Sequence, residues 1–143
     1  MSAPDPSASA PVVLVVEDDA MARDLVEQIL DEAGYRVLAA ESGARAIEIV
    51  RNGPPDLVVL DIMMPGMEGR EVCRWLRANP TTEAVPVIFL SAIDSLAEKL
   101  KAFEAGGNDF VSKPFDDRVF LKKVKDLLRL SGARTSMERI RRR

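Results

Sequence analysis

Five short apolar runs, each followed by a segment with helical periodicity, constrain the fold of this chain more than any other feature. Most of these runs are continuous and rich in Val, Ile and Leu, as is typical of strands buried on both faces of a sheet. The runs lie at Val12–Val16, Tyr35–Ala39, Leu57–Leu60, Val87–Leu90 and Asp109–Val111. Strand–helix alternation with short loops predicts an α/β protein with a parallel sheet and helices on both faces. The more mixed second run suits an outer strand.

The predicted helices follow each apolar run. They lie at Met21–Ala33, from Ser42 to the stop at Gly53, at Gly69–Ala78, from Ser95 to the stop at Gly106, and at Asp116–Leu130. Ser95 and Glu98 form a capping-box pattern, and Gly34 stands where a C-terminal cap belongs. Apolar residues at helical spacing predict the buried face of each helix. In the first helix these are Met21, Leu25 and Ile29, and in the fourth they are Leu96, Leu100 and Phe103.

Composition excludes several classes of function. The 143 residues suffice for one domain with a core, and a net charge of -3 argues against a nucleic-acid surface. No apolar run approaches the roughly 20 residues that span a bilayer. Residues 1–10 lack the pattern of a secretion signal and are expected to be a disordered leader. Cys73 is the single cysteine, which excludes an intrachain disulfide and favours a reducing cytoplasm.

The chain contains no histidine. This absence excludes Ser-His-Asp triads, histidine acid–base catalysis and histidine metal sites. Any chemistry must therefore use carboxylates, lysine, hydroxyl groups or an external group.

Acidic residues follow two of the predicted strands. Glu17, Asp18 and Asp19 come directly after the first strand, and Asp61 ends the third. In open parallel sheets, ligands bind at the carboxyl ends of the strands, near the point where strand order reverses. If the first and third strands are neighbours, Glu17, Asp18 and Asp61 repel one another unless a cation lies between them. Mg²⁺ prefers such oxygen ligands, so the sequence predicts a magnesium site.

Two further polar residues are expected at the same rim. Ser91 ends the fourth strand, and the fifth leads to Lys113. A lysine is a point-charge binder of phosphate, and a hydroxyl group complements it. We interpret the set as a site where Asp61 is the nucleophile that accepts a phosphoryl group. Taken separately, the acidic residues could be a helix N-terminal cluster, and Lys113 a solvated surface side chain.

Four motifs together resemble the response-regulator receiver domain of bacterial two-component signalling. They are "LVVED", "LVVLDIMMPGMEG", "VIFLSA" and "AGGNDFVSKPF", in that order between Pro11 and Leu130. The resemblance implies the flavodoxin-like (βα)5 fold, with a doubly wound parallel sheet of order 2-1-3-4-5. It implies a receiver domain over residues 11–130. It also leaves 131–143 as a basic tail or the start of a linker.

The resemblance also implies roles for individual residues. Glu17 and Asp18 match the acidic pair that holds Mg²⁺, and Asp61 matches the phosphoacceptor, which also binds the metal. Met63 would offer its backbone carbonyl to the ion. The remaining matches are Ser91 to the phosphoryl-binding hydroxyl, Lys113 to the family's lysine, Phe110 to the aromatic switch residue, and Lys113–Pro114 to a cis peptide bond. Ser91, Phe110 and Glu17 stand where threonine, tyrosine and aspartate are commoner.

The implied partner is a sensor histidine kinase or a histidine phosphotransfer protein, because this chain cannot supply a phosphohistidine. The resemblance implies a cytoplasmic switch rather than a turnover enzyme, with no membrane or nucleic-acid contact through this domain. A homodimer formed on phosphorylation is one possible assembly. In the family, the positions two beyond the phosphoacceptor and two beyond the hydroxyl residue tune hydrolysis. Here they are Met63 and Ile93, which predicts slow self-dephosphorylation.

Alternatives remain open at this point. Haloacid-dehalogenase-like phosphatases also place a nucleophilic aspartate after an apolar strand, but they need a second aspartate two residues later, where this chain has Met63. A nucleotide-binding site is disfavoured because no glycine-rich phosphate loop occurs. The chain itself could be a stand-alone regulator or the receiver part of a longer protein.

Overall fold

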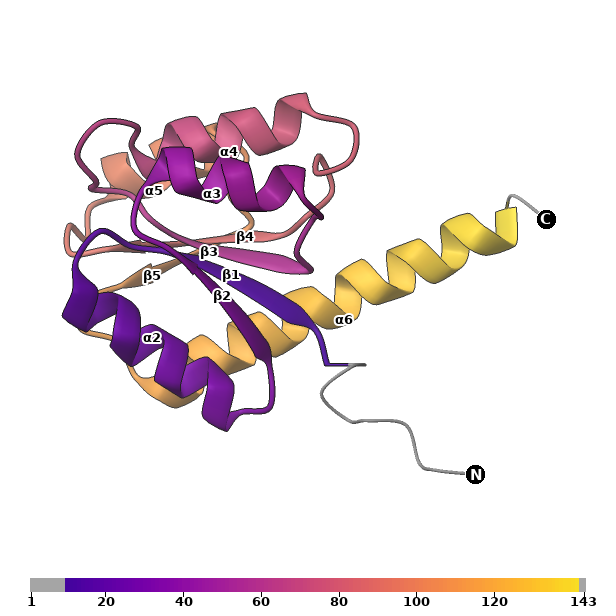
Figure 1. Ribbon diagram of the computed structural model, residues 1–143, viewed down its shortest axis with the longest axis horizontal. Helices are drawn as coiled ribbons and strands as arrows, with labels where there is room; N and C mark the ends of the chain where they lie inside the picture. Colours follow the sequence, from indigo (N-terminus) through magenta and orange to yellow (C-terminus); the bar gives the residue numbers. More distant parts are fainter. Residues whose placement is uncertain (1–9, 142–143) are drawn as a thin grey trace.

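Five parallel strands form one sheet in the order β2-β1-β3-β4-β5, which confirms the predicted topology (Figure 1). The computed structural model describes the backbone of residues 10–141 and the side chains of residues 10–131. The strands are β1 (Val12–Val16), β2 (Arg36–Ala40), β3 (Leu57–Asp61), β4 (Val87–Ser91) and β5 (Asp109–Ser112). The expected leader lies outside the described residues over positions 1–9.

Helices cover both faces of the sheet. They are α2 (Ala20–Glu32), α3 (Gly43–Arg51), α4 (Gly69–Ala78), α5 (Leu96–Glu104) and α6 (Asp117–Arg141). Figure 1 shows α3, α4 and α5 on one face and α2 with α6 on the other. This two-faced covering confirms the doubly wound α/β class expected from the strand–helix alternation.

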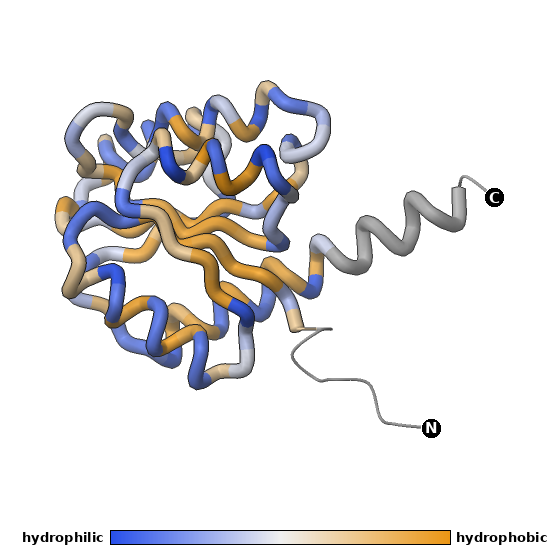
Figure 2. The backbone as a smooth tube through the Cα atoms, in the orientation of Figure 1, coloured by the Kyte–Doolittle hydropathy of each residue, from blue (hydrophilic) through white to orange (hydrophobic). Residues whose placement is uncertain are grey.

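The sheet separates two apolar cores. The first lies under α3, α4 and α5 and includes Leu60 and Phe89, while the second lies under α2 and α6 and includes Val59 and Phe120. Every residue of β3 and β4 is buried, as expected for central strands, and the strands form the apolar centre of Figure 2. Exposed and covered residues alternate along most of β2 instead, as predicted for an edge strand.

Short-range signals set the helix starts. The side chains of Asp19, Ser42 and Ser95 each accept a hydrogen bond from a backbone N–H in the first turn of α2, α3 and α5. These bonds satisfy donors that a helix cannot satisfy internally. After α2 the chain turns at Gly34, whose φ of 96° is open to glycine at little cost. The predicted cap at Ser95 and the predicted stop at Gly34 are therefore confirmed.

The predicted buried face is wrong in part for α2 and throughout for α5. In α2, Met21 and Leu25 are exposed and the buried residues are Val26, Ile29 and Leu30. In α5, the predicted stripe is exposed throughout, and only the small Ala102 is buried. The exposed stripe of α5 is Leu96, Leu100 and Phe103. Both helices carry apolar residues on more than one face, so helical spacing alone cannot tell which face meets the sheet.

The last helix is longer than predicted. The sequence pattern ends it at Leu130, but α6 continues to Arg141 and projects away from the sheet in Figure 1. The pair Ser131-Gly132 does not stop it, because one glycine costs a helix only about 1 kcal/mol and helix-forming residues follow. Within the described residues, no helix combines the length and the apolar character needed to cross a membrane.

Candidate functional site

The ends of β1 and β3 bring acidic side chains together. The two strands are paired in parallel, with Val16 opposite Leu60, so the residues that follow them lie side by side at one edge of the sheet. Glu17, Asp18 and Asp61 each place one carboxylate oxygen in a group of three, and these three oxygens lie within 4.8 Å of one another. The expected acidic cluster is therefore present in the structure.

Lys113 reaches this cluster from the loop after β5. Its Nζ donates hydrogen bonds to Glu17 Oε1 at 2.8 Å and to Asp61 Oδ2 at 2.9 Å. The backbone N–H of Lys113 donates to the Ser91 carbonyl, which holds the loop against β4. The Lys113–Pro114 peptide bond is cis, as the resemblance implied. One ammonium group therefore bridges two carboxylates from different strands.

Burial changes the proton affinity of these groups. Desolvation and the neighbouring Asp61 raise the pKa of Glu17 to about 7. Burial opposes a charged lysine, but hydrogen bonds to Glu17 and Asp61 outweigh it and raise the pKa of Lys113 above its ordinary value. The second carboxylate oxygen of Glu17, Oε2, is buried and has no hydrogen-bond partner among the described residues. An unpartnered buried carboxylate oxygen beside two other carboxylates fits a divalent cation with oxygen ligands.

Asp61 is held by its own loop. The backbone N–H of Met63 donates to Asp61 Oδ1 at 2.9 Å, whereas the Met63 side chain is exposed. On the other side, Gly69 at the start of α4 packs so closely that an added Cβ would lie against the Asp61 carbonyl oxygen. The carboxylate therefore sits on a backbone with little freedom to shift.

Ser91 and Phe110 share one face of the sheet, on the side of α5. Ser91 is fully buried, and its Oγ accepts a hydrogen bond from the Ile93 N–H at 3.0 Å. Phe110, opposite Phe89 in the neighbouring strand, is buried with Lys99 Nζ 5.9 Å from its ring centroid. Ser91 thus lies at the end of β4, the strand beside β3, with its hydroxyl group bonded to its own loop.

One further residue of this rim caps a helix, and another makes a contact that the sequence did not reveal. Asp19 caps α2 by accepting from the Ala22 N–H at 2.9 Å, so the third acidic residue of the run serves the helix. The Arg23 guanidinium donates to the Glu17 carbonyl at 3.0 Å and lies 3.4 Å from the Asp18 carbonyl. Arg23 thereby fixes the backbone of the acidic pair. Its position one turn into a helix gives no signal for this contact in the sequence.

Comparison with known proteins identifies the family. Residues 13–125 match the response regulator receiver domain. Response regulator MprA of Mycobacterium sp. (strain KMS) is 40% identical over 117 residues, which are 82% of this chain and 50% of MprA.

Two solved structures give the same result. The chemotaxis response regulator CheY4 of Vibrio cholerae has a TM-score of 0.79 at 27% identity, covering 83% of this chain and 99% of that one. The receiver domain of sensor histidine kinase PA1611 from Pseudomonas aeruginosa PAO1, solved with a magnesium ion in its active site cleft, has a TM-score of 0.78 at 26% identity. That match covers 84% of this chain and 98% of the other.

The fold belongs to the flavodoxin-like class of α/β proteins. Within that class, the chain belongs to the family of response regulator receiver domains. The chain spans about half the length of MprA. Receiver domains act as signalling switches rather than as ordinary turnover enzymes.

Proposed function

We propose that this chain is a phosphoacceptor switch that takes a phosphoryl group onto Asp61. The donor is a phosphohistidine on a separate kinase or phosphotransfer protein, since this chain has no histidine. A carboxylate oxygen of Asp61 forms the new P–O bond while the P–N bond to the donor imidazole breaks, and the released imidazole takes up a proton. The observation that carries the proposal is the ammonium group of Lys113, 2.9 Å from Asp61 Oδ2.

The residues present fit a bound Mg²⁺. Glu17, Asp18 and Asp61 would hold it with their carboxylates, and Met63 with its backbone carbonyl. The three carboxylates lie close enough to share one ion, and the unpartnered Oε2 of Glu17 offers a further oxygen. When bound, the ion supplies positive charge to the phosphoryl oxygens. The magnesium ion in the PA1611 receiver domain supports this assignment.

The side chains of the protein would neutralise the charge of the phosphoryl group and position it. Phosphoryl transfer depends mainly on these two effects. Lys113 already pairs with Asp61 and would hold the incoming phosphoryl oxygens by the same charge. Ser91, buried at the end of β4, would turn its hydroxyl group from the Ile93 N–H toward the phosphoryl group.

The output would be a change of the surface formed by α5, β5 and α6. Movement of Ser91 leaves space on the face of the sheet where Phe110 is buried, so the two residues form the switch. Leu96, Leu100 and Phe103 of α5 are exposed by 73, 52 and 47% and offer apolar contact to an output domain, a partner or a second copy. We assign the receiver domain to residues 11–130 and a tail or linker to 131–143, in a cytoplasmic protein.

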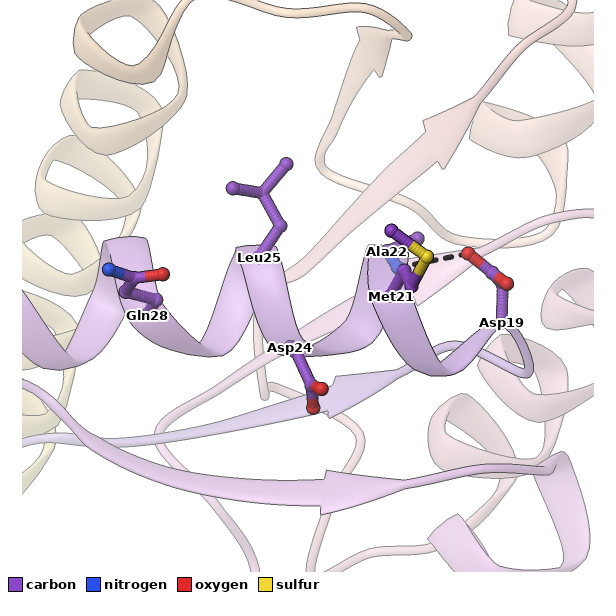
Figure 3. A pocket seen from close by; sticks show the side chains of 6 residues that line it. All are labelled: Asp19, Met21, Ala22, Asp24, Leu25 and Gln28. Atoms are coloured by element: carbon purple, nitrogen blue, oxygen red, sulfur yellow. Dashed lines mark hydrogen bonds between the residues drawn. The ribbon is translucent and has the colours of Figure 1, made fainter.

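The donor would approach over α2. An open depression of about 550 Å³ lies along this helix. Figure 3 shows the side chains that line it, which are Asp19, Met21, Ala22, Asp24, Leu25 and Gln28. Met21 and Leu25 are exposed by 82 and 56%, and the helix starts directly after Asp18. A donor helix resting on these apolar side chains would bring its phosphohistidine to the acidic rim.

Phosphorylation of variants tests the proposed function. The wild type should incorporate label from acetyl phosphate or from a phosphorylated kinase in the presence of Mg²⁺, and Asp61→Asn should incorporate none. Asp31→Asn, which changes an exposed carboxylate on the same molecule, should behave as the wild type. Label retained by Asp61→Asn would refute the assignment of Asp61.

A further inference from the structure

Three charged side chains outside the phosphoacceptor rim join the start of α4 to the start of α5. Arg70 Nε donates to Glu68 Oε1 at 2.6 Å, and Arg70 Nη1 lies 3.5 Å from Glu98 Oε2. The side chains of Glu68, Arg70 and Glu98 are exposed by only 32, 16 and 18%. Because water screens a partly buried pair less than a surface pair, this cluster is a stronger link than ordinary surface ion pairs.

The link between Arg70 and Glu98 is incomplete. A charge-assisted N–H···O bond is about 2.7–2.9 Å long, so 3.5 Å leaves the pair short of a hydrogen bond. Arg70 Nη1 is buried and has no hydrogen-bond partner in the described part of the chain. A buried charged donor without an acceptor costs free energy. A small approach of α5 toward α4 would complete this bond and would therefore be stabilised.

The first turn of α4 is in turn fixed to the phosphoacceptor strand. Gly69, between Glu68 and Arg70, donates its N–H to the Ile62 carbonyl at 3.1 Å. Its Cα faces the Asp61 carbonyl oxygen so closely that no side chain fits between them. A displacement of this turn therefore moves the backbone of Asp61, because packed atoms transmit displacement.

We propose that the cluster of Glu68, Arg70 and Glu98 couples the position of α5 to the backbone of Asp61. Arg70 is the positioning residue, and Gly69 is the contact that transmits the displacement. The inference rests on the proposed function, since it concerns regulation of the same site. It adds a route through α4 to the one through Ser91 and Phe110. In this proposal, phosphorylation draws α5 toward α4 and completes the contact left open at Arg70, so the cluster would favour the phosphorylated arrangement.

Binding of beryllofluoride with Mg²⁺, a phosphoryl analogue, tests this coupling in the full chain. Arg70→Gln and Glu98→Gln should each weaken analogue binding about fivefold, a size usual for residues that carry coupling. The double variant should be no weaker than either single one, because both remove the same link. Glu104→Gln removes the same charge from the exposed end of α5 and should bind as the wild type does.

Thermal unfolding without the analogue separates coupling from simple loss of stability. A purely structural role would lower the unfolding temperature of both variants and leave analogue affinity unchanged, which would overturn the proposal. Additive losses in the double variant would also overturn it. If Arg70→Gln does not fold, Glu98→Gln carries the test alone. Failure of the wild type to bind the analogue would instead refute the proposed function itself.

Discussion

The Nζ atom of Lys113 lies 2.9 Å from Oδ2 of Asp61, although 52 positions separate the two residues in the chain. The same nitrogen lies 2.8 Å from Glu17 Oε1. Three strand ends therefore meet at one ammonium group. This contact makes the charge of Lys113 part of the environment in which Asp61 would react.

Replacement of Lys113 should slow phosphorylation. We expect Lys113→Ala to take label from acetyl phosphate at least about a hundredfold more slowly, the loss typical when one charged stabilising group is removed from a reacting centre. Lys125→Ala, at an exposed position of α6, serves as the matched control. Initial rates at fixed Mg²⁺ measure the effect, and equal rates for both variants would contradict the role given to Lys113.

The raised pKa of Glu17 predicts a pH dependence of stability. The folded state holds the Glu17 proton up to about pH 7, whereas the ordinary value is 4.5. A stabilising contribution is therefore fully present below pH 4.5 and is lost as the pH rises through about 7. The loss is at most about 3 kcal/mol in the free energy of unfolding.

Urea unfolding at about pH 5 and about pH 8, without divalent ions, measures this loss. Glu17→Gln has no titrating group at this position and should show a flatter profile. Mg²⁺ should restore stability to the wild type at the higher pH, since a cation replaces the proton. Parallel profiles for the two proteins would show that Glu17 does not titrate in this range.

Gly69→Ala should destabilise the protein more than a substitution at an uncrowded glycine. The new Cβ would press on the Asp61 carbonyl oxygen, and a forced backbone shift of this kind costs about 1–3 kcal/mol. In Gly34→Ala the added Cβ meets no atom within 4 Å, so the positive φ alone lowers the stability, by about 1 kcal/mol. Urea unfolding compares the two. We expect Gly69→Ala, but not Gly34→Ala, to impair phosphorylation as well.

The phosphorylated form should be long-lived. Met63 and Ile93 are exposed by 56 and 42%, and neither side chain can orient a water molecule for attack on the phosphoryl group. Met63→Asn should shorten the lifetime several-fold, because an amide can position water. Loss of label over time, with Mg²⁺ present, measures both proteins. A half-life of seconds for the wild type would contradict the expectation.

Much of this architecture could be predicted because it follows from short-range patterns. Continuous apolar runs identified β1, β3 and β4, and the rule that parallel strands present their carboxyl ends at one edge brought Asp61 and Lys113 together. The capping pattern at Ser95 predicted the start of α5. These signals lie within a few residues of the structure that they specify.

What the sequence did not reveal depends on which surfaces meet. The buried face of α5 is made by the small Ala102 rather than by the larger Leu96 and Leu100, because contact with the sheet decides burial. The links from Arg23 to the Glu17 carbonyl and from Arg70 to Glu98 each use an arginine of a kind that occurs at many other surface positions. No local pattern marks such pairs, so only coordinates identify them.

The unbroken helix α6 has a mechanical consequence. Its 25 residues form a rod about 37 Å long that starts four positions after Lys113. The part up to Leu128 packs against the sheet, and the part beyond it leaves the body of the molecule. Tilting such a rod by about 5° at its base would carry its far end about 3 Å sideways. A rearrangement too small to alter the sheet would therefore become, at the far end of α6, a displacement wide enough to make or break contacts, so the helix would act as a lever.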